Sequence, residues 1–115
     1  MSERTDRDFL DDIEQAAQRI KAYLAGITYE SFSADTKTQD AIIRNLEIAG
    51  EATKNLSEKL RAQYPHISWK QMAGVRDRLI HHYFGVNLDI VWQIAADEIP
   101  TLLSQLAEIR GDKAR

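Results

Sequence analysis

Four residues within eight positions combine the side chains needed to act on a phosphate ester: Arg76, Asp77, His81 and Tyr83. Histidine can take up and return a proton near neutral pH. Arginine carries a permanent charge on a planar fork that matches phosphate oxygens. His81 could therefore move the proton of a 2′-hydroxyl or of a leaving oxygen, while Arg76 stabilises charge on the phosphate. Asp77 could steady either partner, and this pattern is what metal-free cleavage of RNA requires.

The segment that carries these residues predicts one helix over residues 69–85. Ser68 with Gln71 three residues later fits a capping box at its start, and Gly85 suits the left-handed residue that follows a helix end. At about 100° per residue, Asp77 and His81 share a face, but Arg76 and His81 lie about 140° apart. One helix alone is therefore an incomplete site. We expect a second copy of the chain, facing it across a dimer interface, to complete it.

The composition gives no indication of a metal, a cofactor or a membrane span. His81 and His82 are adjacent, so on a helix they point about 100° apart, which is poor geometry for a shared metal ion. The chain has no cysteine, which excludes disulfides and zinc–thiolate sites. Residues 1–8 are charged and resemble no signal peptide, and no apolar run approaches the roughly 20 residues of a membrane span. We expect a cytoplasmic protein without metal or cofactor.

At 115 residues the chain predicts one domain, with a core over about residues 8–108 and a frayed tail over residues 110–115. The net charge of −3 argues against binding nucleic acid over the whole surface. Residues 54–82, however, contain six Lys or Arg against two Asp or Glu. This local excess suits a small phosphate-binding cleft, although chance unevenness explains it equally well.

Apolar residues recur at helical spacing over residues 4–25, 36–64 and 88–109, and no alternating strand pattern is present. The pattern predicts an all-α fold, an antiparallel bundle of four to five helices. Pro100 lies inside the last helix and should kink or break it. Arg44 and Glu51 lie on the second helix. They either form a solvated ladder of charges or line a cleft that faces the motif helix.

The run from Arg76 to Tyr83, RDRLIHHY, resembles the signature of HEPN ribonucleases, in which a histidine follows an arginine after four to six residues. It is most similar to the HepT-like branch, which has four intervening residues and a tyrosine two positions after the histidine. Residues 41–57 and 67–92 resemble the flanking helices of that family. The resemblance covers about residues 8–108, almost the whole chain.

The resemblance implies a HEPN-like bundle and a homodimer with the motif helices near the two-fold axis. It implies a metal-independent endoribonuclease, the toxin of a type II or type VII-like toxin–antitoxin system in a prokaryote. Arg76 and His81 would be catalytic, with Asp77 in support. The partner it implies is a minimal nucleotidyltransferase antitoxin that silences the toxin by transferring AMP to Tyr83.

Two other functions remain open from the sequence. The chain could be a non-catalytic, nucleotide-binding adaptor that presents Tyr83 to a nucleotidyltransferase. It could also be a structural helical dimer whose polar helix face is only solvated. The presence of both Arg76 and His81 favours the enzyme, because a pure adaptor has less need of this pair.

Overall fold

The structure is a computed structural model that describes residues 3–81 and 85–113. Its elements in chain order are α1 (Asp6–Leu24), α2 (Tyr29–Ser33), α3 (Thr36–Lys54), α4 (Glu58–Gln63), α5 (Trp69–Ala73), α6 (Val75–Leu79), β1 (Ile80–His81), β2 (Gly85–Val86), α7 (Leu88–Gln93), the π-helix η1 (Ile94–Glu98) and α8 (Ile99–Lys113). Apart from the short β1–β2 hairpin, every described element is helical. The predicted all-α bundle is therefore confirmed.

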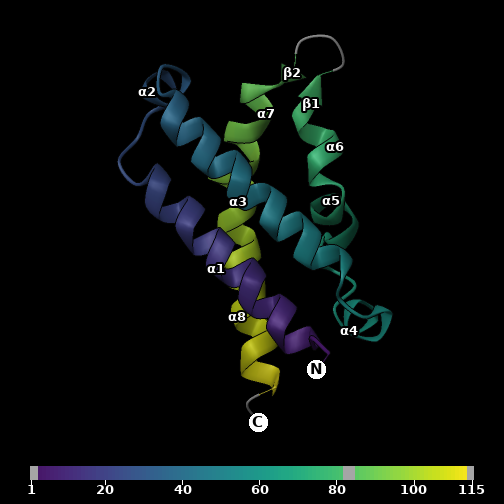
Figure 1. Cartoon of the computed structure of the whole chain (residues 1–115). Helices are drawn as coiled ribbons and strands as arrows, with labels where there is room; N and C mark the ends of the chain where they lie inside the picture. Colours follow the sequence, from purple (N-terminus) through teal and green to yellow (C-terminus); the bar gives the residue numbers. More distant parts are fainter. Residues whose placement is uncertain (1–2, 82–84, 114–115) are drawn as a thin grey trace.

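The two longest helices, α1 and α3, run antiparallel and pack side by side, with α2 at the turn between them (Figure 1). The α7–η1–α8 rod lies behind this pair and packs against α1. The α5–α6 segment packs on the other side of α3 and leads to the hairpin. None of the helices in the described ranges is long and apolar enough to cross a membrane.

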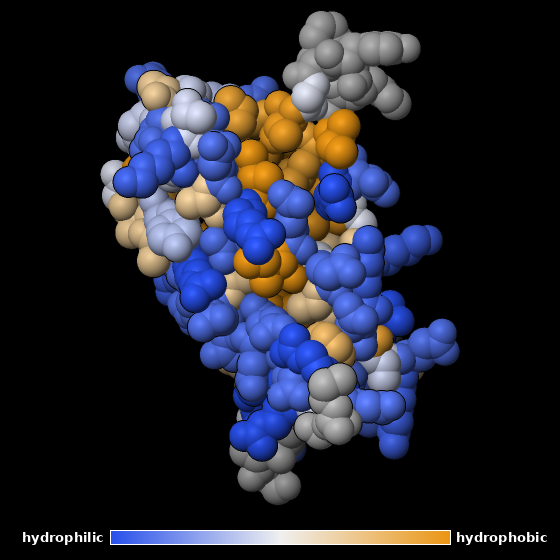
Figure 2. Space-filling view, in the orientation of Figure 1, coloured by the Kyte–Doolittle hydropathy of each residue, from blue (hydrophilic) through white to orange (hydrophobic). Residues whose placement is uncertain are grey.

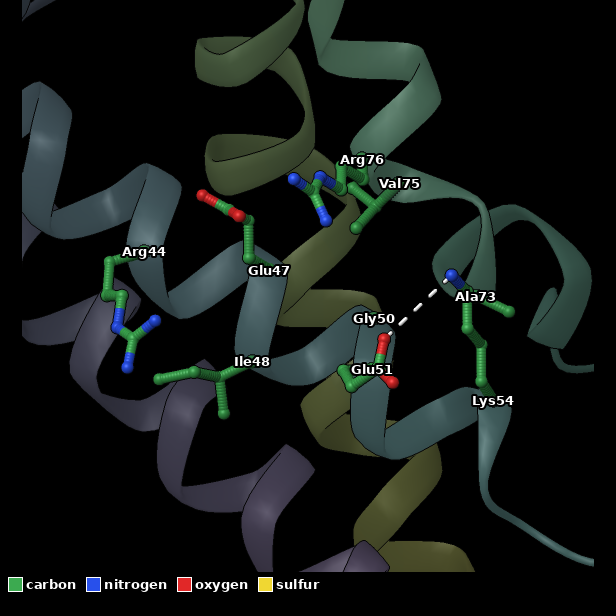
Figure 3. A pocket seen from close by; sticks show the side chains of 9 residues that line it. All are labelled: Arg44, Glu47, Ile48, Gly50, Glu51, Lys54, Ala73, Val75 and Arg76. Carbon is green, nitrogen blue, oxygen red and sulfur yellow. Dashed lines mark ion pairs between the residues drawn. The ribbon is translucent and has the colours of Figure 1, made fainter.

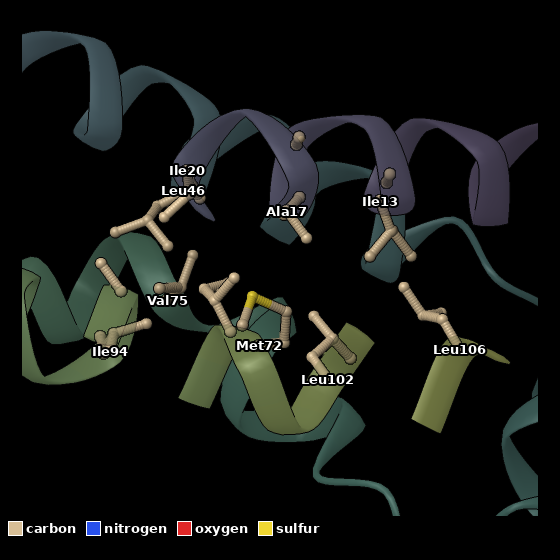
Figure 4. Packing of buried hydrophobic residues seen from close by; sticks show 14 of the residues in the cluster. Ile13, Ala17, Ile20, Leu46, Met72, Val75, Ile94, Leu102 and Leu106 are labelled. Carbon is tan, nitrogen blue, oxygen red and sulfur yellow. The ribbon is translucent and has the colours of Figure 1, made fainter. Parts of the chain in front are cut away.

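The hydrophobic core lies where these layers meet, and each layer contributes side chains that are almost fully buried. Figure 4 shows them interleaved: Ile13, Ala17 and Ile20 from α1, Leu46 from α3, Met72 from α5, Val75 from α6, Ile94 from η1, and Leu102 and Leu106 from α8. The core therefore joins the α5–α6 segment directly to both the α1–α3 pair and the α8 rod.

Side chains at the helix starts explain where several elements begin. Thr5 and Asp8 form a reciprocal capping box at α1, and the Asp35 side chain accepts from the Thr38 N–H at α3. Asn87 caps α7 by accepting from two backbone N–H groups. Ser68 makes no side-chain cap at α5, so the start predicted for the motif helix has no such anchor.

The helix predicted over residues 36–64 is two helices, because the chain turns after Lys54. Ser57 accepts from the Leu60 N–H and begins α4. Its own N–H and hydroxyl donate to the Asp6 carboxylate at 2.8 and 2.6 Å. A long-range bond between α1 and this turn thus stabilises a break that helical periodicity alone does not reveal.

The last helix contains the expected disturbance before Pro100, and it takes the form of a π-helix. Proline lacks an N–H, and its ring collides with the carbonyl four residues earlier in an α-helix. In η1 the Ile99 N–H instead donates to the Ile94 carbonyl, five residues back, which widens this turn. Beyond it, α8 continues to Lys113. Arg110, in the stretch expected to fray, pairs with Asp11 at 2.6 Å. The frayed tail over residues 110–115 stays a prediction.

A glycine on α3 permits the close approach of the α5–α6 segment. Gly50 is buried, and a Cβ atom there would lie 2.6 Å from Val75 Cγ1 and 2.9 Å from the Met72 carbonyl oxygen. Both distances are far below van der Waals contact, and one of them is to backbone. Glycine at this position therefore sets the separation between α3 and the segment that carries Arg76.

We predict that Gly50→Ala destabilises the fold by about 1–3 kcal/mol, because the added methyl group forces α5–α6 away from α3. This cost opposes the gain of up to about 1 kcal/mol that alanine brings to a helix interior. Gly111→Ala is the matched control, since nothing lies near its added Cβ on α8, and we expect it to be neutral or stabilising. Urea unfolding of both variants measures the difference. Equal effects of the two substitutions would contradict the close-packing role of Gly50.

Candidate active site

Arg76 lies on α6 and lines a surface pocket of about 300 Å³ between α3 and the α5–α6 segment. The α3 side of this pocket is formed mainly by charged side chains, namely Arg44, Glu47, Glu51 and Lys54 (Figure 3). Gly50 and Val75 lie at its base, at the close approach of the helices. The structure thus places Arg76, Arg44 and Glu51 around one pocket, although these residues are far apart in the sequence.

The charges around this pocket are mixed, with three cations and two carboxylates. Glu51 pairs with Lys54 at 3.8 Å, and both side chains are largely exposed. Glu47 is half-buried and lines the same pocket as Arg76 (Figure 3). Within the described part of the chain, however, neither of these two residues has an ion-pair partner. Arg76 therefore keeps its hydrogen-bond donors available for an anion. The carboxylate of Glu47, which lines the same pocket, makes the electrostatic potential there less positive.

Arg78 does not line this pocket and is held by Glu98 of η1. Its guanidinium donates to both carboxylate oxygens of Glu98, at 2.9 and 2.6 Å, and both side chains are about 30% exposed. These hydrogen bonds raise the pKa of Arg78 above its ordinary value, against the opposing effect of desolvation. A bidentate pair of this kind fixes orientation as well as distance. Residue spacing in the sequence does not reveal this pair, because Glu98 lies 20 residues away.

Asp77 is exposed on α6, and its N–H donates to the Gly74 carbonyl at 3.1 Å. This bond belongs to the first turn of the helix. The supporting role predicted for Asp77 depends on the His81 side chain, which lies outside the described part of the structure. That role stays a prediction.

His81 does not lie on the motif helix, so the prediction of a single helix over residues 69–85 is wrong. The helix has a break at Gly74 and ends at Leu79, after which Ile80–His81 forms β1. Ile80 pairs with Val86 and His81 with Gly85, and the Asn87 N–H donates to the Leu79 carbonyl at 2.8 Å. The angles expected between Arg76, Asp77 and His81 on a helix therefore do not apply.

The run after Leu79 favours this hairpin for local reasons. Ile80, Tyr83, Phe84 and Val86 are β-branched or aromatic residues, which are enriched in strands. Gly85 has φ +77°, the left-handed conformation expected for it, but it adopts this conformation in the hairpin. Residues 82–84 lie outside the described residues, and so does the predicted modification site Tyr83.

Among the residues that the structure describes, no three His, Asp or Glu side chains gather as a set of metal ligands. His66, the histidine outside the motif, lies 3.3 Å from Glu108 on α8. It therefore helps to tie the loop before α5 to the C-terminal helix.

Comparison with known proteins places the chain among ribonuclease-like sequences. The family described as Ribonuclease HepT-like matches residues 13–109. A candidate RNase of Methanocaldococcus jannaschii is 43% identical over 97% of this chain and 93% of its own length. A candidate ribonuclease HepT of Thermococcus cleftensis is 41% identical over 93% of this chain and 97% of its own. A candidate RNase of Caldanaerobacter subterraneus is 42% identical over 92% of this chain and 95% of its own length. No solved structure matches the chain significantly.

We predict that Glu47→Gln strengthens the binding of a small polyanion such as tripolyphosphate by about two- to fivefold. Removing one negative charge from the lining of the pocket changes the interaction energy with the anion by about 1 kcal/mol or less near a protein surface. Arg76→Gln should weaken binding instead, and Glu30→Gln on α2 serves as the control for the change in net charge. Titration followed by NMR measures all three. Equal strengthening by Glu47→Gln and Glu30→Gln would show that the pocket is not the binding site.

Proposed function

Because the chain belongs to the HepT-like ribonuclease family of the HEPN superfamily, we propose that it is a metal-independent endoribonuclease whose catalytic residues are Arg76 and His81. The observation that carries this proposal is the position of Arg76, unpaired within the described residues, beside the cations of α3. Arg44 and Lys54 add two cations to which a strand's phosphates can bind. We place the protein in the cytoplasm of a prokaryote.

The proposed reaction is an internal transfer at one phosphate. The 2′-oxygen loses its proton to a histidine and forms a bond to phosphorus, while the bond from phosphorus to the 5′-oxygen breaks. That oxygen takes up a proton, leaving a 2′,3′-cyclic phosphate and a 5′-hydroxyl. Arg76 stabilises the negative charge on the non-bridging oxygens. Proton removal and proton return require two groups or one group used twice, and a homodimer would provide two copies of His81.

The surface beside the motif supports a homodimer. Ile80 and Val86 face each other across the hairpin and are 54% and 42% exposed. Figure 2 shows hydrophobic side chains gathered on this face between α3 and the hairpin, with hydrophilic residues around them. An exposed apolar patch with a polar rim is typical of a protein interface. A second copy packed here would bring two motif segments together.

We further propose that the protein is the toxin of a type II or type VII-like toxin–antitoxin system. Its partner would be a minimal nucleotidyltransferase that transfers AMP to Tyr83. Asp77 would support the catalytic pair. A bulky anion two residues from His81 would occupy the phosphate site and repel RNA.

We predict that the purified protein cuts RNA in EDTA and leaves 2′,3′-cyclic phosphate ends. Arg76→Ala and His81→Ala should each reduce the rate at least about 100-fold, because each removes a group that acts in the transition state. His66→Ala should cut normally, since His66 lies in a loop away from the pocket. Gel assays of a defined RNA, with circular dichroism to verify folding, measure this.

Unchanged cutting by both Arg76→Ala and His81→Ala would contradict the catalytic assignment. Loss of all cutting in EDTA, restored by a divalent cation, would contradict metal independence. Nucleotide binding without any RNA cleavage would favour the non-catalytic adaptor.

We predict that a cognate minimal nucleotidyltransferase with ATP adds AMP to the wild-type chain and stops RNA cleavage. Tyr83→Phe should remain active and unmodified, whereas Tyr64→Phe should be modified and inactivated like the wild type. Intact-protein mass spectrometry detects the added adenylyl groups, and the RNA assay follows activity. Modification of Tyr83→Phe, or full activity of the modified wild type, would contradict the proposal.

A further inference from the structure

Arg76 and Arg78 leave α6 in opposite directions, and Arg78 ties the helix to another element. Two residues along an α-helix are about 200° apart. Arg76 lines the pocket over α3, whereas Arg78 reaches Glu98 at the end of η1. The Arg78–Glu98 pair thus holds the back of the short helix whose front carries the proposed catalytic arginine.

The pair also lies next to the point where the helix becomes a strand. Leu79 is the last residue of α6, Ile80 begins β1, and the Leu79 carbonyl accepts from the Asn87 N–H after β2. Arg78 therefore lies between Arg76 and His81 in the sequence, two residues before Ile80, where the backbone becomes extended. Movement of α6 at this point would change the offset between the two proposed catalytic residues.

The location of Glu98 depends on the π-helix. A π turn contains one more residue than an α turn, so it rotates the later residues of the rod by about 100° relative to a regular helix. Glu98 is the last residue of η1, and the widened turn precedes Pro100. In an uninterrupted α-helix the Glu98 side chain would leave the rod in a different direction, and its carboxylate would not face Arg78 as it does here. The π-helix and the bidentate pair thus belong to one arrangement that links α7–α8 to the motif.

We propose that Arg78 and Glu98 are positioning residues for the ribonuclease site, which fix where α6 ends and so set His81 relative to Arg76. This inference rests on the proposed function. Neither residue lines the pocket, so neither is assigned contact with RNA. This positioning role requires both hydrogen bonds from the Arg78 guanidinium to the Glu98 carboxylate. A lysine, which carries the same charge but no planar fork, cannot form this pair of bonds.

The test compares Arg78→Lys and Glu98→Gln with Arg110→Lys. Arg110 forms a similarly exposed pair with Asp11 at 2.6 Å, but it links α8 to α1. We expect kcat for RNA cleavage to fall about 10- to 100-fold in the first two variants, with KM changed by less than about threefold. Arg110→Lys should cut like the wild type. The double reversal Arg78→Glu with Glu98→Arg should recover part of the lost kcat.

A second measurement does not depend on activity. Hydrogen exchange of the Asn87 amide, which is bonded to Leu79, should become several times faster in Glu98→Gln and unchanged in Arg110→Lys. Wild-type kcat in both Arg78→Lys and Glu98→Gln, or unchanged Asn87 exchange in Glu98→Gln, would overturn the positioning role. Unchanged cutting by His81→Ala would instead contradict the proposed function, and the exchange experiment would still decide the role of the pair.

Discussion

The close approach of the α5–α6 segment to α3 at Gly50 is the constraint on which the rest of the structure depends. Without a side chain at this position, Val75 and the Met72 carbonyl pack directly on α3. The contact brings a short helix with Arg76 over a long helix with Arg44, Glu47, Glu51 and Lys54. It also places Met72 and Val75 in the shared core. A single glycine therefore serves both the packing of the bundle and the shape of the pocket.

The motif segment is held in three directions, and each contact has a different physical origin. Van der Waals packing holds its front on α3 through Val75. A bidentate ion pair holds its back to η1 through Arg78. Backbone hydrogen bonds hold its end through the β1–β2 hairpin. Short helices have little stability of their own, so these contacts determine where Arg76 is placed. Arg76 lies on α6 and His81 on β1. The proposed catalysis by these two residues therefore depends on the contacts that hold the two elements together.

Helical periodicity was sufficient to predict the all-α bundle, because each long helix buries one apolar face. It was not sufficient for the boundaries. The break after Lys54 depends on Asp6, which is 51 residues from Ser57. The hairpin replaces the end of the motif helix because Ile80 and Val86 pair as strands. These determinants are tertiary contacts or strand propensity, and a helical pattern does not contain them.

In the candidate site, too, the sequence predicts some features, whereas others depend on tertiary contacts. The residue types identified Arg76 and the chemistry that it can perform, and the family comparison supports an RNA substrate. The pairing of Arg78 with Glu98 cannot be predicted from the sequence, because Glu98 lies on a distant element whose direction depends on a π turn. The roles of His81, Asp77 and Tyr83 remain predictions from the motif. Sequence thus indicates candidate reacting groups, but it does not indicate the contacts that hold the segment on which they lie.

The most direct test is a solved structure of the protein with a dinucleotide whose 2′-oxygen is blocked by a methyl group. We predict that the side chains of Arg76 and His81, from one subunit or from two across the hairpin face, both lie within hydrogen-bond distance of the same phosphate. A dinucleotide bound with Arg76 and His81 on separate phosphates, or remote from both residues, would contradict it.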